Sequence, residues 1–124
     1  MNYCWTTFYV KDLQRSVSFY QEVLGLEIRS KFHTGDATEI VMLGKENATL
    51  VELVCNQKLV VSTSCLSMGF EVEGTLEETM EQLKQKGIPV IRGPISPVPS
   101  MKFLFIKDPD GVEIQLVQHV HQPE

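Results

Sequence analysis

The chain opens with a short segment in which apolar and polar residues alternate, followed by a segment of helical period. Residues 3–10 alternate and are rich in residues that favour strands. Asp12 is a favourable helix N-cap, and apolar residues then recur at helical spacing as far as Leu24. Gly25 suits the position just after a helix. The pattern predicts a strand and then a helix.

Three more strands follow this helix, and the second half of the chain then repeats the whole order. Thr75 and Glu78 have the spacing of a capping box at the start of the second helix. Residues 108–111, Asp-Pro-Asp-Gly, have strong turn chemistry between the last two strands. The further predicted strands lie at residues 26–32, 37–43, 49–55, 66–72, 89–91, 102–106 and 112–117.

The two halves are related by a nearly constant offset. Asp12 lies 63 residues before Thr75, and Glu52 lies 63 residues before Gln115. A repeat of this length indicates a duplicated supersecondary unit. Each half has the order βαβββ.

We therefore predict an α+β fold of two tandem βαβββ modules, at about residues 1–57 and 63–119, within a single domain of residues 1–124. A helix covers one face of each sheet, and pairing the two uncovered faces would curve the sheets around a ligand cleft. Residues 93–100 hold three prolines between two predicted strands. We expect them to form a loop without structure of its own, as a lid or a stiff rim.

Composition narrows the class of protein. The chain has 124 residues, of which 43% are hydrophobic and 22% charged, as in an ordinary globular domain. The net charge of −5, without a basic cluster, argues against a nucleic-acid partner. No targeting segment and no membrane span is recognisable, so we expect a cytoplasmic protein without a membrane partner. Cys4, Cys55 and Cys65 lack metal-type spacing and read as reduced thiols, with a reactive Cys65 as the minor alternative.

Strand parity predicts which side chains face the cleft. If Phe8 packs under the first helix, Trp5 and Thr7 point to the opposite face of the strand. The same alternation applied to the later strands places further polar residues on the uncovered faces. The predicted ligand-binding residues are Trp5, Thr7, Glu52, Ser67 and Gln115.

Two motifs resemble those of a known family. Residues 12–20 read D-L-x-R-S-x-x-F-Y, and residues 108–116 read D-P-D-G-x-x-I-x-L. These resemble the opening and closing signatures of the vicinal-oxygen-chelate superfamily, which includes glyoxalase I, extradiol dioxygenases, fosfomycin-resistance transferases and bleomycin-binding proteins. The resemblance covers essentially the whole chain and implies the same two-module fold. It also implies a homodimer.

The resemblance implies a metal site that this chain matches poorly. Glyoxalase-like relatives hold a divalent metal with His or Gln, Glu, His and Glu, where this chain has Trp5, Glu52, Ser67 and Gln115. A catalytic divalent site needs about three good protein ligands. We therefore expect no cofactor. Glu52 and Gln115 as ligands to nickel, zinc, manganese or iron are the alternative.

The histidines do not complete that site. His33 ends a predicted strand and is expected to be partly exposed. His119 and His121 are expected in a solvated chain end, where only adventitious metal binding would occur.

Three functions follow as hypotheses. The first is metal-independent binding of an aromatic or antibiotic-like small molecule, with Trp5, Tyr3 and Tyr9 as a stacking surface; alternatively Trp5 only fills space. The second is a glyoxalase-I-like lyase or isomerase, with Glu52 as the catalytic base and with Gln115 and Ser67 as hydrogen-bond donors to the developing oxyanion. Alternatively, Glu52 and Gln115 only hydrogen-bond each other across the cleft. The third is a non-catalytic regulatory paralogue.

Overall fold

The computed structural model describes residues 3–35, 37–58 and 66–119. The chain divides into two compact units, residues 1–63 and 64–124. Cys65 and His121 lie outside the described residues. The prediction that both modules form a single domain around a cleft stays a prediction.

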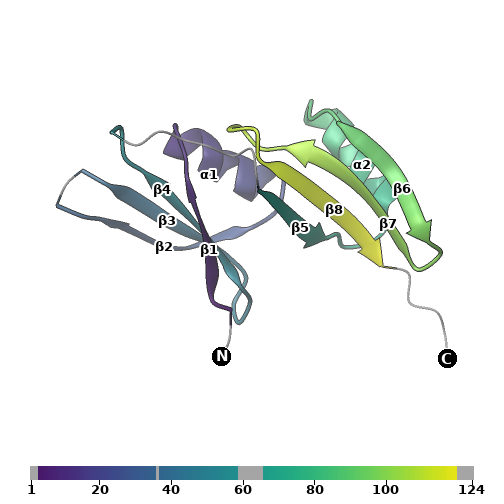
Figure 1. The fold of residues 1–124 in the computed structure, drawn as a ribbon, viewed down its shortest axis with the longest axis horizontal. Coiled ribbons are helices and arrows are strands. Elements are labelled where there is room, and N and C mark those ends of the chain that lie inside the picture. Colours follow the sequence, from purple (N-terminus) through teal and green to yellow (C-terminus); the bar gives the residue numbers. More distant parts are fainter. Residues whose placement is uncertain (1–2, 36, 59–65, 120–124) are drawn as a thin grey trace. The chain divides into compact units, whose positions relative to one another are not determined.

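Unit 1 is a four-stranded mixed sheet with one helix against it (Figure 1). The strand order is β1-β4-β3-β2, and only the β1–β4 pair is parallel. The elements are β1 Trp5–Tyr9, α1 Leu13–Glu22, β2 Glu27–His33, β3 Glu39–Gly44 and β4 Leu50–Cys55.

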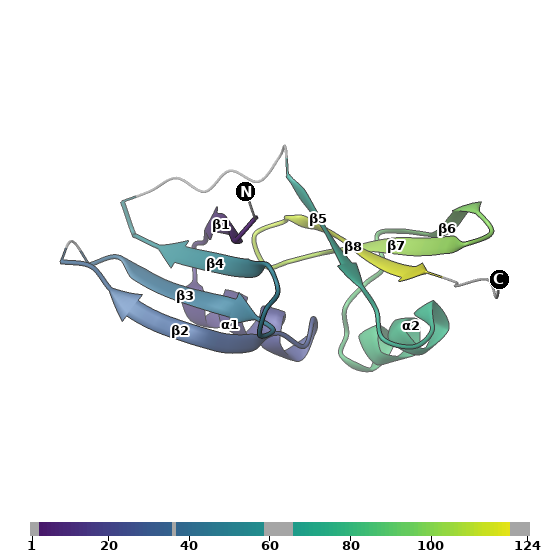
Figure 2. The same cartoon turned by 90° about the horizontal axis from the view of Figure 1, so that it is seen from below.

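Unit 2 has the same topology, with the strand order β5-β8-β7-β6 and a parallel β5–β8 pair. Figure 2 shows α2 against one side of this sheet. The repeated βαβββ order confirms the predicted α+β class. The elements are β5 Ser67–Glu71, α2 Leu76–Gln85, β6 Arg92–Val98, β7 Met101–Lys107 and β8 Glu113–His119.

The two helices begin and end as the sequence predicts. The Asp12 carboxylate accepts a hydrogen bond from the Arg15 amide at 3.1 Å, and the Thr75 hydroxyl accepts one from the Glu78 amide at 3.1 Å. These contacts satisfy backbone donors that a helix start leaves unpaired. Both helices are followed by a glycine in the left-handed region, Gly25 with φ 72° and Gly87 with φ 71°.

The helix-side faces of the sheets form the core of each unit. In unit 1, Phe8 lies between more exposed neighbours, and Leu43 and Leu53 are fully buried. In unit 2, Leu104 and Ile114 occupy the same kind of position. Alternation of buried and exposed residues is what a sheet with one covered face requires.

Two polar contacts tie α2 to its sheet in unit 2. The Gln118 side chain accepts a hydrogen bond from the Leu76 amide at 2.7 Å, so it caps a second donor at the helix start. The Lys102 ammonium lies 2.9 Å from Glu77, and this hydrogen bond lowers the pKa of Glu77.

Residues 93–100 do not form the expected unstructured loop, because most of them belong to β6. The strand predicted at residues 89–91 is also wrong, because the corresponding strand, β6, begins at Arg92. β6 is an edge strand, where the missing N–H of proline is tolerated. Gly93 has φ 92°, and a Cβ there would lie 2.9 Å from the Phe103 carbonyl oxygen, so only glycine fits.

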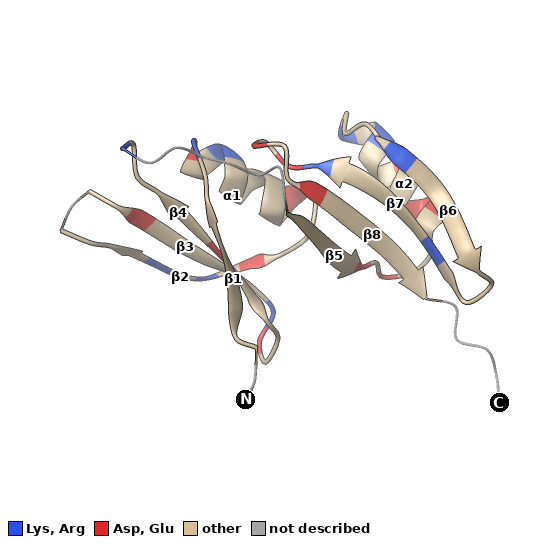
Figure 3. Cartoon of the chain, viewed as in Figure 1, with Lys and Arg blue, Asp and Glu red and all other residues tan. Residues whose placement is uncertain are grey.

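Charged residues are interspersed in both units. Figure 3 shows acidic and basic positions mixed along the strands and helices. Within the described ranges, no helix is long and apolar enough to cross a membrane.

The turn before β8 supplies a test of the closing motif. Asp108 is buried, and its carboxylate accepts hydrogen bonds from the amides of Asp110 at 2.9 Å and Val112 at 2.8 Å. Asp108→Ala would leave these donors without their charged partner, so the free energy of unfolding should fall by about 3 kcal/mol. Asp108→Asn should lose about half as much, since one amide oxygen still accepts.

Guanidinium denaturation followed by circular dichroism measures both changes. The exposed Glu46 serves as the control, and Glu46→Ala should stay within about 0.5 kcal/mol of the unchanged chain. An Asp108→Ala variant as stable as that control would contradict the assigned role.

Candidate functional site

The helix-free face of unit 1 carries a row of side chains that crosses four strands. Thr7, Glu52, Met42 and Ser30 are successive partners in the ladder from β1 through β4 and β3 to β2. The Thr7 hydroxyl donates a hydrogen bond to Glu52 Oε1 at 2.7 Å. Among the described residues, Oε2 of Glu52 accepts no hydrogen bond, so this oxygen can meet a ligand.

Aromatic side chains lie on the same face of β1. Trp5 and Tyr9 share the parity of Thr7 and are each 50% exposed. Half-exposed aromatic rings next to a carboxylate present an apolar surface with one polar handle. The structure thus brings Trp5, Thr7 and Glu52 together on one face, as parity predicts; their binding of a ligand stays a prediction.

The helix-free face of unit 2 carries the counterpart row with different chemistry. Gly69, Gln115, Phe105 and Arg92 are successive partners from β5 through β8 and β7 to β6. A Cβ on Gly69 would lie 3.8 Å from Gln115 Oε1, so the absent side chain leaves room beside the amide. Ser67 lies two residues before Gly69 on the same face of β5.

Arg92 is held by two contacts. Its guanidinium carbon lies 4.1 Å from the centre of the Phe105 ring, and Nη2 lies 3.1 Å from Glu113 Oε2. Phe103 packs edge-on against Phe105 with ring centres 5.7 Å apart. A guanidinium that stacks on one ring can accept a planar group on its other side.

The sequence analysis missed Phe103 and Phe105, although they alternate regularly with the buried Leu104 and Ile106 of β7 and parity could have found them. Parity could not have found Arg92, because β6 does not alternate with period two. Its ladder has two irregularities, so every third residue of β6 is paired with every second residue of β7. The signal in the sequence is the three-residue spacing between Pro94 and Pro97.

The residues present do not fit a divalent metal. Trp5 offers no lone pair for a metal, Ser67 is a neutral hydroxyl and Gln115 is a neutral amide. Glu52 is the single carboxylate of the predicted set, and it already accepts a hydrogen bond from Thr7. Within the described ranges, no group of three or more His, Cys, Asp and Glu side chains could hold a metal ion.

The structure describes two of the three histidines, and neither completes a metal site with the predicted residues. His33 is the last residue of β2 and is exposed, as expected. His119 does not belong to a frayed end, since it is the last residue of β8 and its Nδ1 lies 3.2 Å from Glu71 Oε2. The ladder with β7 extends to His119 and places it on the helix-free face.

Comparison with known proteins agrees with this architecture. Residues 4–116 match the Glyoxalase/Bleomycin resistance protein/Dioxygenase superfamily. A probable lactoylglutathione lyase of Synechocystis sp. is 30% identical over 122 residues, which cover 91% of this chain and 92% of that protein.

Two solved structures share the fold. Trypanothione-dependent glyoxalase I of Leishmania major is 26% identical with a TM-score of 0.80, over 95% of this chain and 86% of that one. TnmS3, an antibiotic-binding protein from a Streptomyces species, is 19% identical with a TM-score of 0.75, over 96% of each chain. The duplicated topology and the match over nearly the whole sequence show that the chain belongs to the Glyoxalase/Bleomycin resistance protein/Dioxygenase superfamily.

Proposed function

We propose that the protein binds a planar aromatic small molecule on its helix-free faces and needs no metal to do so. The observation that carries this proposal is the row Gly69–Gln115–Phe105–Arg92, in which an open position, an amide, a ring and a guanidinium follow one another across one sheet. A planar ligand can lie against the Phe105 ring and the Arg92 guanidinium, while the Gln115 side-chain amide forms a hydrogen bond with the polar edge of the ligand.

The expected energetics are those of stacking on an exposed surface, since about half of the Arg92 side chain is exposed. Each aromatic contact contributes on the order of 0.5–1.5 kcal/mol beyond the burial of area. A guanidinium stacked at an exposed site adds about 0.5–1 kcal/mol. Trp5 presents a separate aromatic surface on the helix-free face of unit 1.

The relatives support two kinds of activity for this fold. TnmS3 is an antibiotic-binding protein, and its likeness to this chain concerns the fold. The relative from Synechocystis is a probable lactoylglutathione lyase. Because Trp5, Ser67 and Gln115 fit a metal poorly, binding is the function that the residues of this chain favour.

A lyase or isomerase is the second candidate, and Glu52 is the observation that favours it. Its Oε2 has no partner among the described residues and lies on the helix-free face. A carboxylate placed in this way can take a proton from a carbon next to a carbonyl group. The regulatory, non-catalytic alternative predicts that neither face binds a small molecule.

Replacing Arg92 tests the binding surface. The probe is 2-naphthoate, with decalin-2-carboxylate as its non-aromatic counterpart, titrated by calorimetry. Arg92→Met should weaken 2-naphthoate binding about fivefold and Phe105→Leu about threefold, because each removes a stacking partner. The saturated probe should bind at least about fivefold more weakly than the aromatic one.

Arg29→Met is the matched control, since Arg29 is an exposed arginine of unit 1. It should leave the affinity unchanged. Equal affinity for 2-naphthoate and decalin-2-carboxylate would contradict the proposed binding surface. Unchanged 2-naphthoate binding in Arg92→Met and Phe105→Leu would contradict it as well.

Glu52→Gln separates the two candidate functions. A binding protein should keep its 2-naphthoate affinity within about twofold, because the amide is nearly isosteric with the carboxylate. A lyase should lose at least about a hundredfold in kcat for conversion of lactoylglutathione, since the amide cannot accept the proton. Measurable turnover in the unchanged chain that disappears in Glu52→Gln would show that the protein is a lyase and that Glu52 is its base.

Calorimetric titration of chelator-stripped protein with nickel, zinc, manganese and iron(II) tests metal independence. We expect no stoichiometric binding that depends on Glu52 or Gln115. Weak binding that disappears in His119→Asn/His121→Asn would agree with this expectation. Stoichiometric binding that is lost in Glu52→Gln and survives the histidine changes would contradict it.

A further inference from the structure

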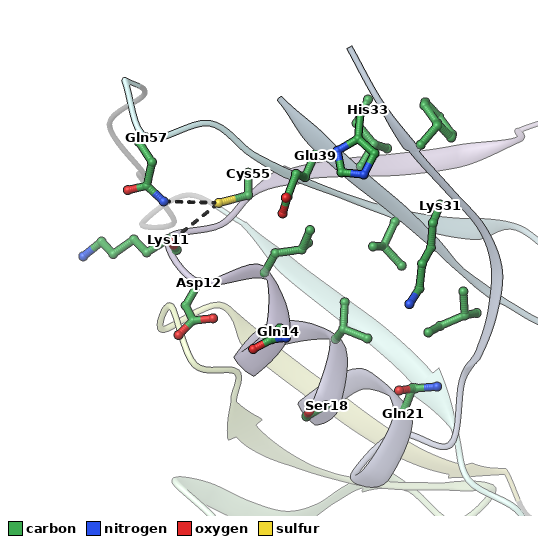
Figure 4. Close-up of a pocket in the computed structure, with 16 residues that line it drawn as sticks. Lys11, Asp12, Gln14, Ser18, Gln21, Lys31, His33, Glu39, Cys55 and Gln57 are labelled. Atoms are coloured by element: carbon green, nitrogen blue, oxygen red, sulfur yellow. Dashed lines mark hydrogen bonds between the residues drawn. The ribbon is translucent and has the colours of Figure 1, made fainter. Parts of the chain in front are cut away.

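Unit 1 contains a groove on its helix side, on the face of the sheet opposite the Thr7–Glu52 row. The groove has a volume of about 740 Å³ and lies between α1 and the strands β2 and β3 (Figure 4). Its lining comes from residues 11–57, so unit 1 builds it alone. A volume of this size falls within the range of about 300–1,000 Å³ that is typical of small-molecule sites.

The groove exists because α1 does not cover β2. The helix packs against β3 and β4, and most of β2 is exposed on its helix side. Gln14, Ser18 and Gln21 recur at helical spacing along the flank of α1 that lines the groove. These polar side chains cannot close onto the sheet as apolar ones would, so a channel remains beside the helix.

Apolar side chains form the floor of this channel. Val17 of α1, Ile28 of β2 and Val41 of β3 line it, and Val17 and Ile28 are only half-buried. Half-buried aliphatic groups gain about 25 cal/mol for each Å² of apolar surface that a ligand covers. A hydrocarbon chain therefore fits the floor.

The charges at the two ends of the groove differ. Lys11 and Asp12 line the same end as Glu39, and Figure 4 shows the Lys11 ammonium pointing away from the groove. Figure 4 shows Lys31 reaching from β2 toward α1 on the side of Gln21, whereas Glu39 points into the groove at the other end. Among the described residues, no carboxylate pairs with Lys31. His33 is the ladder partner of Glu39 and lies at that second end.

We propose that this groove binds an amphipathic monocarboxylate. Its carboxylate would pair with the Lys31 ammonium and accept a hydrogen bond from the Gln21 amide, and its apolar chain would lie on Val17, Ile28 and Val41. The Glu39 carboxylate opposes a negative charge at the far end, so it fixes the direction of the ligand and disfavours a dicarboxylate. This site is separate from the proposed aromatic-binding faces.

Amide chemical shifts of the full ¹⁵N-labelled chain test the proposal, with sodium octanoate as the probe and octanamide as its neutral counterpart. We expect saturable shifts at Ile28, Lys31 and Val41 with a Kd on the order of 1 mM, as befits a ligand of this size. Octanamide should bind the same residues more weakly, because it cannot pair with Lys31.

Three variants identify the contacts. Lys31→Gln should weaken octanoate binding about fivefold and leave octanamide binding unchanged. Gln21→Trp fills the groove from an exposed position of α1 and should abolish the binding of both probes. Lys58→Gln, an equal change of charge at an exposed position that does not line the groove, should change neither.

Two results would overturn the proposal. One is an unchanged octanoate affinity in Lys31→Gln with a native spectrum. The other is a set of octanoate shifts confined to Trp5, Glu52 and their neighbours, which would place the ligand on the helix-free face. Failure here leaves the 2-naphthoate experiment untouched, because that experiment tests Arg92 and Phe105 of unit 2, whereas the groove belongs to unit 1.

Discussion

The width of a helix relative to a sheet is the constraint on which each unit depends. A helix is about 10 Å wide with its side chains, whereas four strands at about 4.8 Å spacing span about 15 Å. The single ten-residue helix of each unit can therefore cover two or three strands of one face. The helix of each unit leaves the other face and one sheet edge without a helix, and these are the surfaces that carry the candidate sites. In unit 1 the uncovered edge is β2, beside which the groove lies.

The irregular edge strand β6 decides the chemistry of unit 2. A regular strand would send alternate residues to opposite faces. Two irregularities in the pairing with β7 instead bring Arg92, Ile95 and Val98 opposite Phe105, Phe103 and Met101, which share one face. Gly93 allows the first irregularity, because a side chain there would meet the backbone of β7. The guanidinium consequently comes to lie over a ring.

The two units carry rows of the same geometry and different chemistry. Thr7 and Glu52 in unit 1 correspond to Gly69 and Gln115 in unit 2, and in both units the pair spans the parallel strands. In unit 1, the Thr7 hydroxyl donates a hydrogen bond to the Glu52 carboxylate. In unit 2, Gly69 has no side chain, so there is open space beside the Gln115 amide. The row of unit 1 therefore carries a negative charge, whereas the row of unit 2 ends in an aromatic ring and a cation.

The sequence by itself determined the element order, both helix caps and the face of each regular strand, because these depend on local propensity and on periods of 3.6 and 2. Asp12, Thr75 and the placement of Glu52 were predictable for this reason. Only the tertiary structure decided that residues 92–98 pair with β7, that Arg92 stacks on Phe105 and that α1 leaves a groove beside Lys31. Pairing between strands and the lateral position of a helix depend on contacts distant in the sequence, which no local pattern encodes.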